Sequence, residues 1–170
     1  MYDHVAGGFH RYSTDQQWLV PHFEKMLYDN ALLVVAYLEA YQVTGRSDFA
    51  YVAKDILRYL ARDMTSPEGG FYSATDADSL NPEGHRDEGY FFTWTPEEFK
   101  GVLGADSTWA QMHYGMTAGG NFEGRNILFS AQRFDESMTS KLGSINEALY
   151  VARKTRPAPL RDEKILTAWN

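Results

Sequence analysis

Apolar side chains recur at helical spacing over residues 22–44, the strongest pattern in the chain. One stripe consists of Phe23, Met26, Leu27, Ala31, Val34, Leu38 and Tyr41. Pro21 fits a first helical position, and Gly45 fits the residue just past a helix end. Because apolar residues also fill most of the opposite face, we expect a helix that is buried on all sides.

A second helix is predicted from Ser47, as its cap, to about Met64. Its apolar residues gather on one side, with charged residues largely opposite, so this helix should face water. A short turn containing Gly45 separates the two patterns. The sequence therefore predicts an antiparallel helical hairpin whose inner member packs against further helices.

Shorter elements follow. Residues 69–79 and 90–94 read as two short strands joined by a Pro- and Gly-containing loop. Thr95 caps and Pro96 starts a helix that Gly104 ends. A short helix over 106–116, a turn with a short strand over 119–130, and a long helix over about 136–154 complete the pattern. The predicted fold is mainly α, with short β-strands in the connections.

Composition and charge narrow the function classes. At 170 residues, the chain is long enough for one domain with a sizeable core. Its net charge of -7 repels nucleic acid and anionic lipid. The absence of a long apolar run and of a signal-peptide pattern predicts a cytoplasmic protein without membrane association. With no cysteine and no paired histidine spacing, we expect neither a metal site nor a cofactor.

A short motif occurs twice. GGFHRYSTD begins at Gly7, and GGFYSATD begins 62 residues later at Gly69. Paired glycines allow a tight turn with positive φ, and the aromatic residue that follows can plug the core beneath it. A repeat at about the length of a helical hairpin with its connections indicates stacked hairpins.

Several longer motifs resemble one known family. They are GGFHRYSTDQQWLVPHFEKMLYDNALL, GGFYSATDADS, EGYFFTWTPEE, GNFEGRNIL and RDEKILTAWN. Together, these motifs resemble the YyaL-like family, which includes the spermatogenesis-associated thioredoxin-domain proteins. They span nearly the whole chain, and the part they resemble is the helical region beyond the family's thioredoxin-like domain.

This resemblance implies a fold and a domain organisation. The family's helical region is similar to the (α/α)₆ toroids of six-hairpin glycosidases and N-acylglucosamine 2-epimerases. Residues 1–170 would form a single partial toroid domain of two to three hairpins, without the thioredoxin-like domain and the remaining hairpins. The edge at which the ring stops would then be an apolar surface for self-association.

Polar residues at the start of the first predicted helix are candidates for a pocket at the toroid mouth. His22, Tyr28, Asp29 and Asn30 head a helix whose remainder is apolar. A carboxylate beside a histidine or lysine can have its proton affinity adjusted for acid or base work. Charged residues in this position equally fit a helix start with an ordinary surface ion pair.

Further candidates lie in the predicted loops. Two carboxylates about 5 to 9.5 Å apart are the minimum for glycoside hydrolysis, and Asp15 with Asp76 or Asp78 is the leading pair. Aspartate in Gly-rich loops also commonly bonds local backbone amides. The predicted catalytic residues are Asp15, Asp29 and Asp76. The predicted substrate-binding residues are His10, Arg11, Trp18, His22, Tyr28, Asn30 and Asp78.

Two functions from different classes follow. The first is a fragment of a carbohydrate-active protein, hydrolase or 2-epimerase in type, that binds a sugar among aromatic and carboxylate side chains. The second is a non-catalytic helical scaffold or interaction module, because fold similarity alone does not establish chemistry. Convergence of Arg11, Asp15, His22, Asp29 and Asp76 on one pocket would favour the first function.

Overall fold

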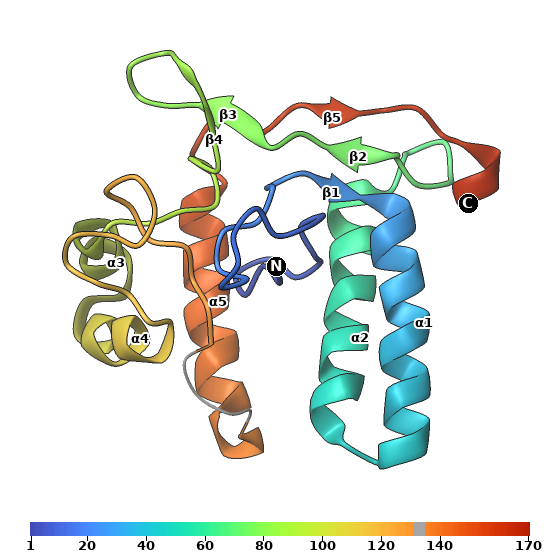
Figure 1. Ribbon diagram of the computed structural model, residues 1–170, viewed down its shortest axis with the longest axis horizontal. Helices are drawn as coiled ribbons and strands as arrows, with labels where there is room; N and C mark the ends of the chain where they lie inside the picture. The colour runs from blue at the N-terminus through green and yellow to red at the C-terminus, as the bar shows by residue number, and fades with distance from the viewer. Residues whose placement is uncertain (131–134) are drawn as a thin grey trace.

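The structure, a computed structural model, describes residues 1–130 and 135–170 and is mainly helical (Figure 1). A hairpin of two long helices stands on one side, and three helices form a group on the other. The α-helices are α1 (Leu27–Thr44), α2 (Ser47–Tyr59), α3 (Pro96–Leu103), α4 (Ser107–His113) and α5 (Thr139–Arg153). None of the helices in these described residues has both the length and the apolar content needed to cross a bilayer.

The predicted hairpin of α1 and α2 is confirmed. Gly45 ends α1 in the left-handed conformation, with φ of 69°, and its N–H donates to Tyr41 O. The α2 helix continues as a π-helical turn, Leu60–Met64, which agrees with the predicted end. Leu27, Ile56 and Met64 lie in the apolar cluster between the two helices.

The predicted start of α1 is wrong by five residues. Residues 21–26 are not helical, because backbone groups in this segment bond to Arg11, Tyr12 and β2 instead of to a helix. Within this segment, β1 (Lys25–Met26) pairs antiparallel with β2 (Ala74–Thr75). These sheet partners lie about fifty residues further along the chain, so helical spacing and Pro21 could not reveal them.

The prediction that α1 is buried on all sides is also wrong for this chain. Leu32 is 68% exposed, Val35 52% and Val43 86%, and only Leu27 and Asn30 of this helix are buried. The reason is that α1 packs mainly against α2, which covers one side (Figure 1). The other side presents an apolar face to solvent.

The sequence predicted a cap at Thr95 and another at Ser47, and the structure confirms only the first. Thr95 accepts a hydrogen bond from the Glu98 N–H, and the Glu98 side chain accepts one from the Thr95 N–H, which completes a capping box at the start of α3. Ser47, by contrast, is the first residue of α2, and the residue before it, Arg46, makes no side-chain cap hydrogen bond. The predicted Ser47 cap is therefore absent.

Short strands join the two helix groups. A three-stranded antiparallel sheet has the order β1–β2–β5, with β5 at Arg161–Asp162. A second pair consists of β3 (Asp78–Leu80) and β4 (Arg86–Glu88). The strand predicted for residues 90–94 is wrong: the N–H groups of Phe92 and Thr93 both donate to Gly89 O, which closes a turn.

The N-terminal segment lies between the two helix groups and contacts both (Figure 1). Val5 belongs to the apolar cluster of α3, α4 and α5, which also contains Trp94, Phe99 and Leu149. Phe9 packs against the cluster of α1 and α2. The first ten residues thus bridge these two clusters, and the predicted long helix near the C-terminus, α5, supplies part of one of them. A third, smaller cluster contains Phe23, Ala77, Phe92 and Ile127.

Both copies of the Gly-Gly-Phe motif adopt the predicted left-handed turn. The φ angles are 78° and 76° at Gly7 and Gly8, and 90° and 77° at Gly69 and Gly70. The two copies differ in their packing. A Cβ atom at Gly8 would lie 2.5 Å from the Tyr59 ring, whereas one at Gly69 would meet open space.

Candidate functional site

Residues 11–24 form an irregular hairpin that brings polar side chains together at the start of α1. The N–H of Arg11 donates to Glu24 O at 2.9 Å, and the N–H of His22 donates to Tyr12 O at 2.8 Å. This backbone pairing places Arg11 Nη1 2.9 Å from Glu24 Oε2 and His22 Nε2 3.7 Å from the same oxygen. Arg11 and His22, both predicted from the sequence, therefore converge.

A second carboxylate approaches from β4. Oε1 of Glu88 lies 2.7 Å from His22 Nδ1 and accepts a hydrogen bond from the Phe23 N–H at 3.2 Å. We refer to the group at this place as the α1-head cluster, which consists of Arg11, His22, Glu24, Tyr28, Asp29 and Glu88. Its members come from the hairpin, from the first turn of α1 and from β4.

Asp29 is the chemically distinctive member of this cluster. Its Oδ2 atom is buried and has no hydrogen-bond partner among the described residues. Burial raises the pKa of the Asp29 carboxyl above its ordinary value; the Arg11 cation opposes this shift, and the Glu24 carboxylate adds to it. Asp29 thus retains its proton to a higher pH than an exposed aspartate does.

Aromatic rings border the α1-head cluster. Tyr12 stacks on His22 with ring centroids 5.0 Å apart. Tyr28 meets Trp169 edge-on at 4.9 Å and lies beside Arg11. Trp18 is 72% exposed, at a backbone φ of 59°. Flat, accessible rings of this kind offer surfaces on which a sugar ring can stack.

The other predicted aspartates make contacts within their own loops. Asp15 Oδ1 accepts hydrogen bonds from the N–H groups of Leu19 and Val20 and from Ser13 Oγ. Desolvation raises the pKa of Asp15, but these hydrogen bonds together lower it by more. The pKa of Asp15 therefore lies below its ordinary value. The catalytic role of Asp15 stays a prediction, and these contacts match the local loop alternative.

Asp76 is held similarly in the second loop. Its Oδ1 accepts a hydrogen bond from the Ala77 N–H at 2.8 Å, and its Oδ2 accepts one from Arg86 Nη2 at 2.8 Å. Asp78 lies in β3, opposite Glu88 of β4. Within the described part of the chain, no hydrogen bond joins Asp15 to Asp76 or to Asp78. The roles of Asp76 and Asp78 also stay predictions.

Two predicted substrate-binding residues lie inside the fold. His10 is 5% exposed, and its Nδ1 lies 2.8 Å from Phe23 O, so Nδ1–H donates to that carbonyl. Asn30 has no exposed surface; its Oδ1 accepts from the Phe9 N–H, and its Nδ2 donates to Phe9 O and Met26 O. Both side chains fasten the N-terminal segment to the region of α1.

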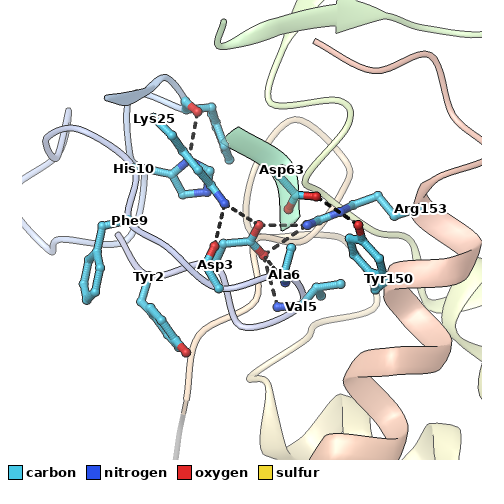
Figure 2. Close-up of polar contacts among 12 residues, drawn as sticks. Tyr2, Asp3, Val5, Ala6, Phe9, His10, Lys25, Asp63, Tyr150 and Arg153 are labelled. Atoms are coloured by element: carbon cyan, nitrogen blue, oxygen red, sulfur yellow. Dashed lines mark hydrogen bonds and ion pairs between the residues drawn. The ribbon is translucent and has the colours of Figure 1, made fainter. Parts of the chain in front are cut away.

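Sequence reasoning missed a buried ionic group that joins Asp3, Lys25 and Arg153 (Figure 2). The Asp3 carboxylate accepts hydrogen bonds from Lys25 Nζ at 2.7 Å and from both terminal nitrogens of Arg153 at 3.0 and 2.8 Å. The three residues are at most 6% exposed. No local pattern signals this group, because Asp3 and Arg153 are 150 residues apart in the sequence.

A cavity of about 490 Å³ lies next to Lys25 and Arg153. It is bounded by β1, by the end of α2 with its π-helical turn, by the end of α5 and by the chain leading into β5. We refer to it as the α2–α5 cavity. Over residues 1–130 and 135–170, no group of three or more His, Asp or Glu side chains is placed to hold a metal ion.

Comparison with known proteins gives a consistent set of relatives. No protein-family model matches the chain. Spermatogenesis-associated protein 20 from human is 46% identical over 199 residues, which cover 99% of this chain and 25% of that protein. The proteins of the same name from mouse and rat are 42% and 41% identical over the same shares of each chain.

The motifs that suggested a family resemblance lie within this matched region, which includes nearly every residue of the chain. The chain spans about a quarter of the length of these relatives. Over nearly all of its own length, it is thus similar to one stretch of the proteins named spermatogenesis-associated protein 20.

Proposed function

We propose that the α1-head cluster binds a carbohydrate, and that the chain is part of a carbohydrate-active protein. The observation that carries this proposal is that Arg11 and Glu24 lie near the partly buried carboxyl of Asp29, whose Oδ2 has no partner among the described residues, and that His22 approaches Glu24. Sugar hydroxyls both donate and accept hydrogen bonds, so they suit a cluster that offers cationic donors beside carboxylate acceptors. The rings of Tyr12 and Tyr28 supply stacking surfaces there, and the exposed Trp18 belongs to the same hairpin as Arg11 and His22.

In this proposal, Asp29 serves as the proton donor. A general acid in glycoside chemistry needs a carboxyl group whose pKa is raised, while a second carboxyl group stays ionised. Glu24, which accepts a hydrogen bond from Arg11, fits the second carboxyl group. The cluster therefore offers two carboxyl groups in different surroundings, whereas the sequence prediction took Asp15 with Asp76 or Asp78 as the leading pair.

We also propose that the helices form part of an (α/α)₆ toroid and that residues 1–170 are a single domain of it. The antiparallel pair of α1 and α2 has the form of one hairpin of such a ring, and the apolar outer face of α1 would be covered by a neighbouring hairpin. The α1-head cluster would then face the mouth of the ring.

A thermal-shift screen of neutral mono- and disaccharides on the chain tests the carbohydrate proposal. We expect at least one sugar to raise the melting temperature of the parent, and Asp29→Asn to abolish this rise, because the amide cannot donate the carboxyl proton or carry its charge. Asp106→Asn, at an exposed ion pair with Lys141 outside the cluster, is the matched control and should retain the shift. If no sugar stabilises the parent, or if Asp29→Asn retains the full shift, the proposal is wrong.

The exposed face of α1 favours a second function, that of an interaction module which associates with another copy of itself. Leu32, Val35 and Val43 are more than half exposed on this face, and a contiguous apolar patch on a soluble protein commonly marks an interface. Sedimentation velocity should show concentration-dependent dimers for the parent and monomers for Leu32→Glu/Val35→Glu. A parent that stays monomeric at high concentration would exclude this module.

A further inference from the structure

Five cationic side chains line the α2–α5 cavity, although the chain as a whole is acidic, with a net charge of -7. They are Lys25, Arg62, Arg153, Lys154 and Arg161. Asp63 is the one acidic residue among the described residues of the lining. Such a local reversal of charge concentrates anions from solution, because low-dielectric walls focus the field of the cations into the cavity.

Aromatic rings hold these cations in place. The Tyr150 ring lies 3.9 Å from Arg62 Cζ and 5.5 Å from Lys154 Nζ. The Phe92 ring lies 5.5 Å from Lys25 Nζ and 5.4 Å from Arg153 Cζ. Each ring thus brings two like charges close together, which cation–π attraction favours and charge repulsion opposes. An anion in the cavity would relieve this repulsion.

The carboxylates near the cavity do not balance its cations. Lys25 and Arg153 share Asp3, Arg62 pairs with Asp63, and Arg161 pairs with Glu163 on the surface. Lys154 has no ion pair within the described residues and is exposed. Five cations therefore face three carboxylates. One excess cation is Lys154 at the rim, and the other belongs to the buried pair of Lys25 and Arg153, which share Asp3.

Two buried donors of the inner wall also lack an acceptor. Arg153 Nε has no hydrogen-bond partner among the described residues. Tyr59 Oη approaches the Thr75 side chain without a hydrogen bond of normal geometry. A buried donor without an acceptor costs about 1–3 kcal/mol, so these groups favour an occupant rich in oxygen acceptors. Thr75 itself also lines the cavity.

We propose that the α2–α5 cavity binds a small phosphomonoester, with the phosphate among the rim cations and a ring-shaped body against Tyr150 and Phe91. The excess of two cations matches the charge of a phosphate dianion. Lys154 and the N–H groups of Arg62 and Arg161 that are not bonded to Asp63, Ala6 or Glu163 can donate to its oxygens. The volume of about 490 Å³ lies within the range of small-molecule sites.

Isothermal titration calorimetry at low ionic strength tests this proposal, with inorganic phosphate, glucose 6-phosphate and glucose as probes. Glucose 6-phosphate should bind more tightly than inorganic phosphate, because only the former has a ring to place against Tyr150. Lys154→Gln/Arg161→Gln should raise the dissociation constants of both phosphate probes at least tenfold. Both side chains are exposed, so these changes should leave the fold intact.

A matched variant separates the cavity from the overall charge of the protein. Lys54→Gln/Lys100→Gln removes the same two positive charges at exposed positions that do not line the cavity, and it should keep the parent's affinity. Equal weakening in both double variants, or absence of phosphate binding to the parent, would overturn the site. Equal affinity for inorganic phosphate and glucose 6-phosphate would overturn the ring-binding part.

This proposal is independent of the carbohydrate proposal for the α1-head cluster. Asp29→Asn leaves every lining residue of the cavity in place, so its affinity for inorganic phosphate should equal that of the parent. Loss of the neutral-sugar shift with retained phosphate binding would separate the two sites. Loss of phosphate affinity in Asp29→Asn would show instead that phosphate binds at the α1-head cluster, against the cavity proposal.

Discussion

His10 shows how burial changes the chemistry of a single side chain. The ring lies edge-on to Phe23 and Phe92, with centroids 5.3 and 4.7 Å away, and Nδ1–H donates to the Phe23 carbonyl. Burial lowers the pKa of His10 well below its usual range, and the neighbouring Lys25 cation lowers it further. The imidazole is therefore neutral in the folded protein at neutral and mildly acidic pH.

The free energy of unfolding should consequently fall as the pH is lowered from 7.5 to 5.0. Below about pH 6.5, the imidazole takes up a proton in the unfolded chain but not in the folded protein, so acid favours unfolding. At pH 5, the loss is about 2 kcal/mol for a histidine that stays neutral in the fold. Urea denaturation at the two pH values measures it.

Two variants assign this pH dependence to His10. His10→Gln should flatten the dependence, whereas His85→Gln should leave it unchanged, because the His85 side chain is 74% exposed. His4, whose pKa burial lowers to about 4, contributes in the same direction, so a residual slope remains in His10→Gln. An unchanged slope in His10→Gln would contradict the assignment.

At the scale of residues, the sequence identified part of the α1-head cluster. His22 and Asp29 were found because an apolar helix pattern begins beside them, and Arg11 was found as a polar residue of the predicted loop. Glu88 could not be found in this way, since it reaches His22 from β4, 66 residues away. Asp15 and Asp29 are the same residue type, so the sequence does not distinguish them. In the structure, backbone N–H groups bind the Asp15 carboxylate, whereas Asp29 Oδ2 is buried without a hydrogen-bond partner among the described residues.

At the scale of elements, the start of α3 has the clearest local determinant in the chain. Glu98 completes the capping box with Thr95, and the same side chain also accepts a hydrogen bond from Arg125 Nη2 at 2.7 Å. The start of α2 lacks such a cap. The two helix starts therefore form a natural pair for comparing a hydroxyl that caps with one that does not.

Thr95→Ala should destabilise the protein by about 1 kcal/mol, the usual cost of losing a capping side chain. Ser47→Ala is the matched change at a helix start without a cap, and we expect a shift within about 0.5 kcal/mol of zero. Thermal unfolding monitored by circular dichroism measures both. Equal destabilisation by the two substitutions would show that the Thr95 hydroxyl contributes no more than that of Ser47.

The elements that the sequence predicted well are those with local causes. The hairpin turn at Gly45 and the capped start of α3 depend on residues within a few positions of each other. The start of α1 failed because β1 pairs with β2 across about fifty residues. The burial of α1 failed because its exposure depends on which other helices pack against it, and helical spacing does not contain that information.

At the scale of the whole molecule, Asp3 joins parts of the chain that are distant in sequence. It connects the N-terminal segment to Lys25 of β1 and to Arg153 of α5 (Figure 2). The neighbouring Val5 and Phe9 pack into the two separate apolar clusters. One buried carboxylate therefore stands at the point where the two helix groups meet.

Asp3→Asn should destabilise the protein by about 3–5 kcal/mol, because the amide leaves two buried cations without a counter-charge. Urea denaturation followed by fluorescence measures this loss, and the variant should unfold at a distinctly lower midpoint. Asp106→Asn is the control, since its ion pair with Lys141 is about half exposed and is expected to contribute less than about 1 kcal/mol. Similar midpoints for the two variants would refute this role for Asp3.

The overall architecture was predictable only in part. The mainly helical class follows from hydrophobic spacing, which is a local property. The bridging position of the N-terminal segment does not, because it depends on contacts as distant as that between Asp3 and Arg153. Such contacts become visible only when the whole chain is folded.

The two Gly-Gly-Phe turns, alike in backbone conformation, should respond differently to evolutionary drift. Any side chain at Gly8 would collide with the Tyr59 ring. In a saturation library selected for folded protein, nearly all variants at Gly8 should therefore be lost. At Gly69, the only barrier is the left-handed φ of 90°, which asparagine and aspartate tolerate best among the other amino acids. Survivors at Gly69 should therefore be enriched in these two residues, which makes Gly69 freer to diverge than Gly8.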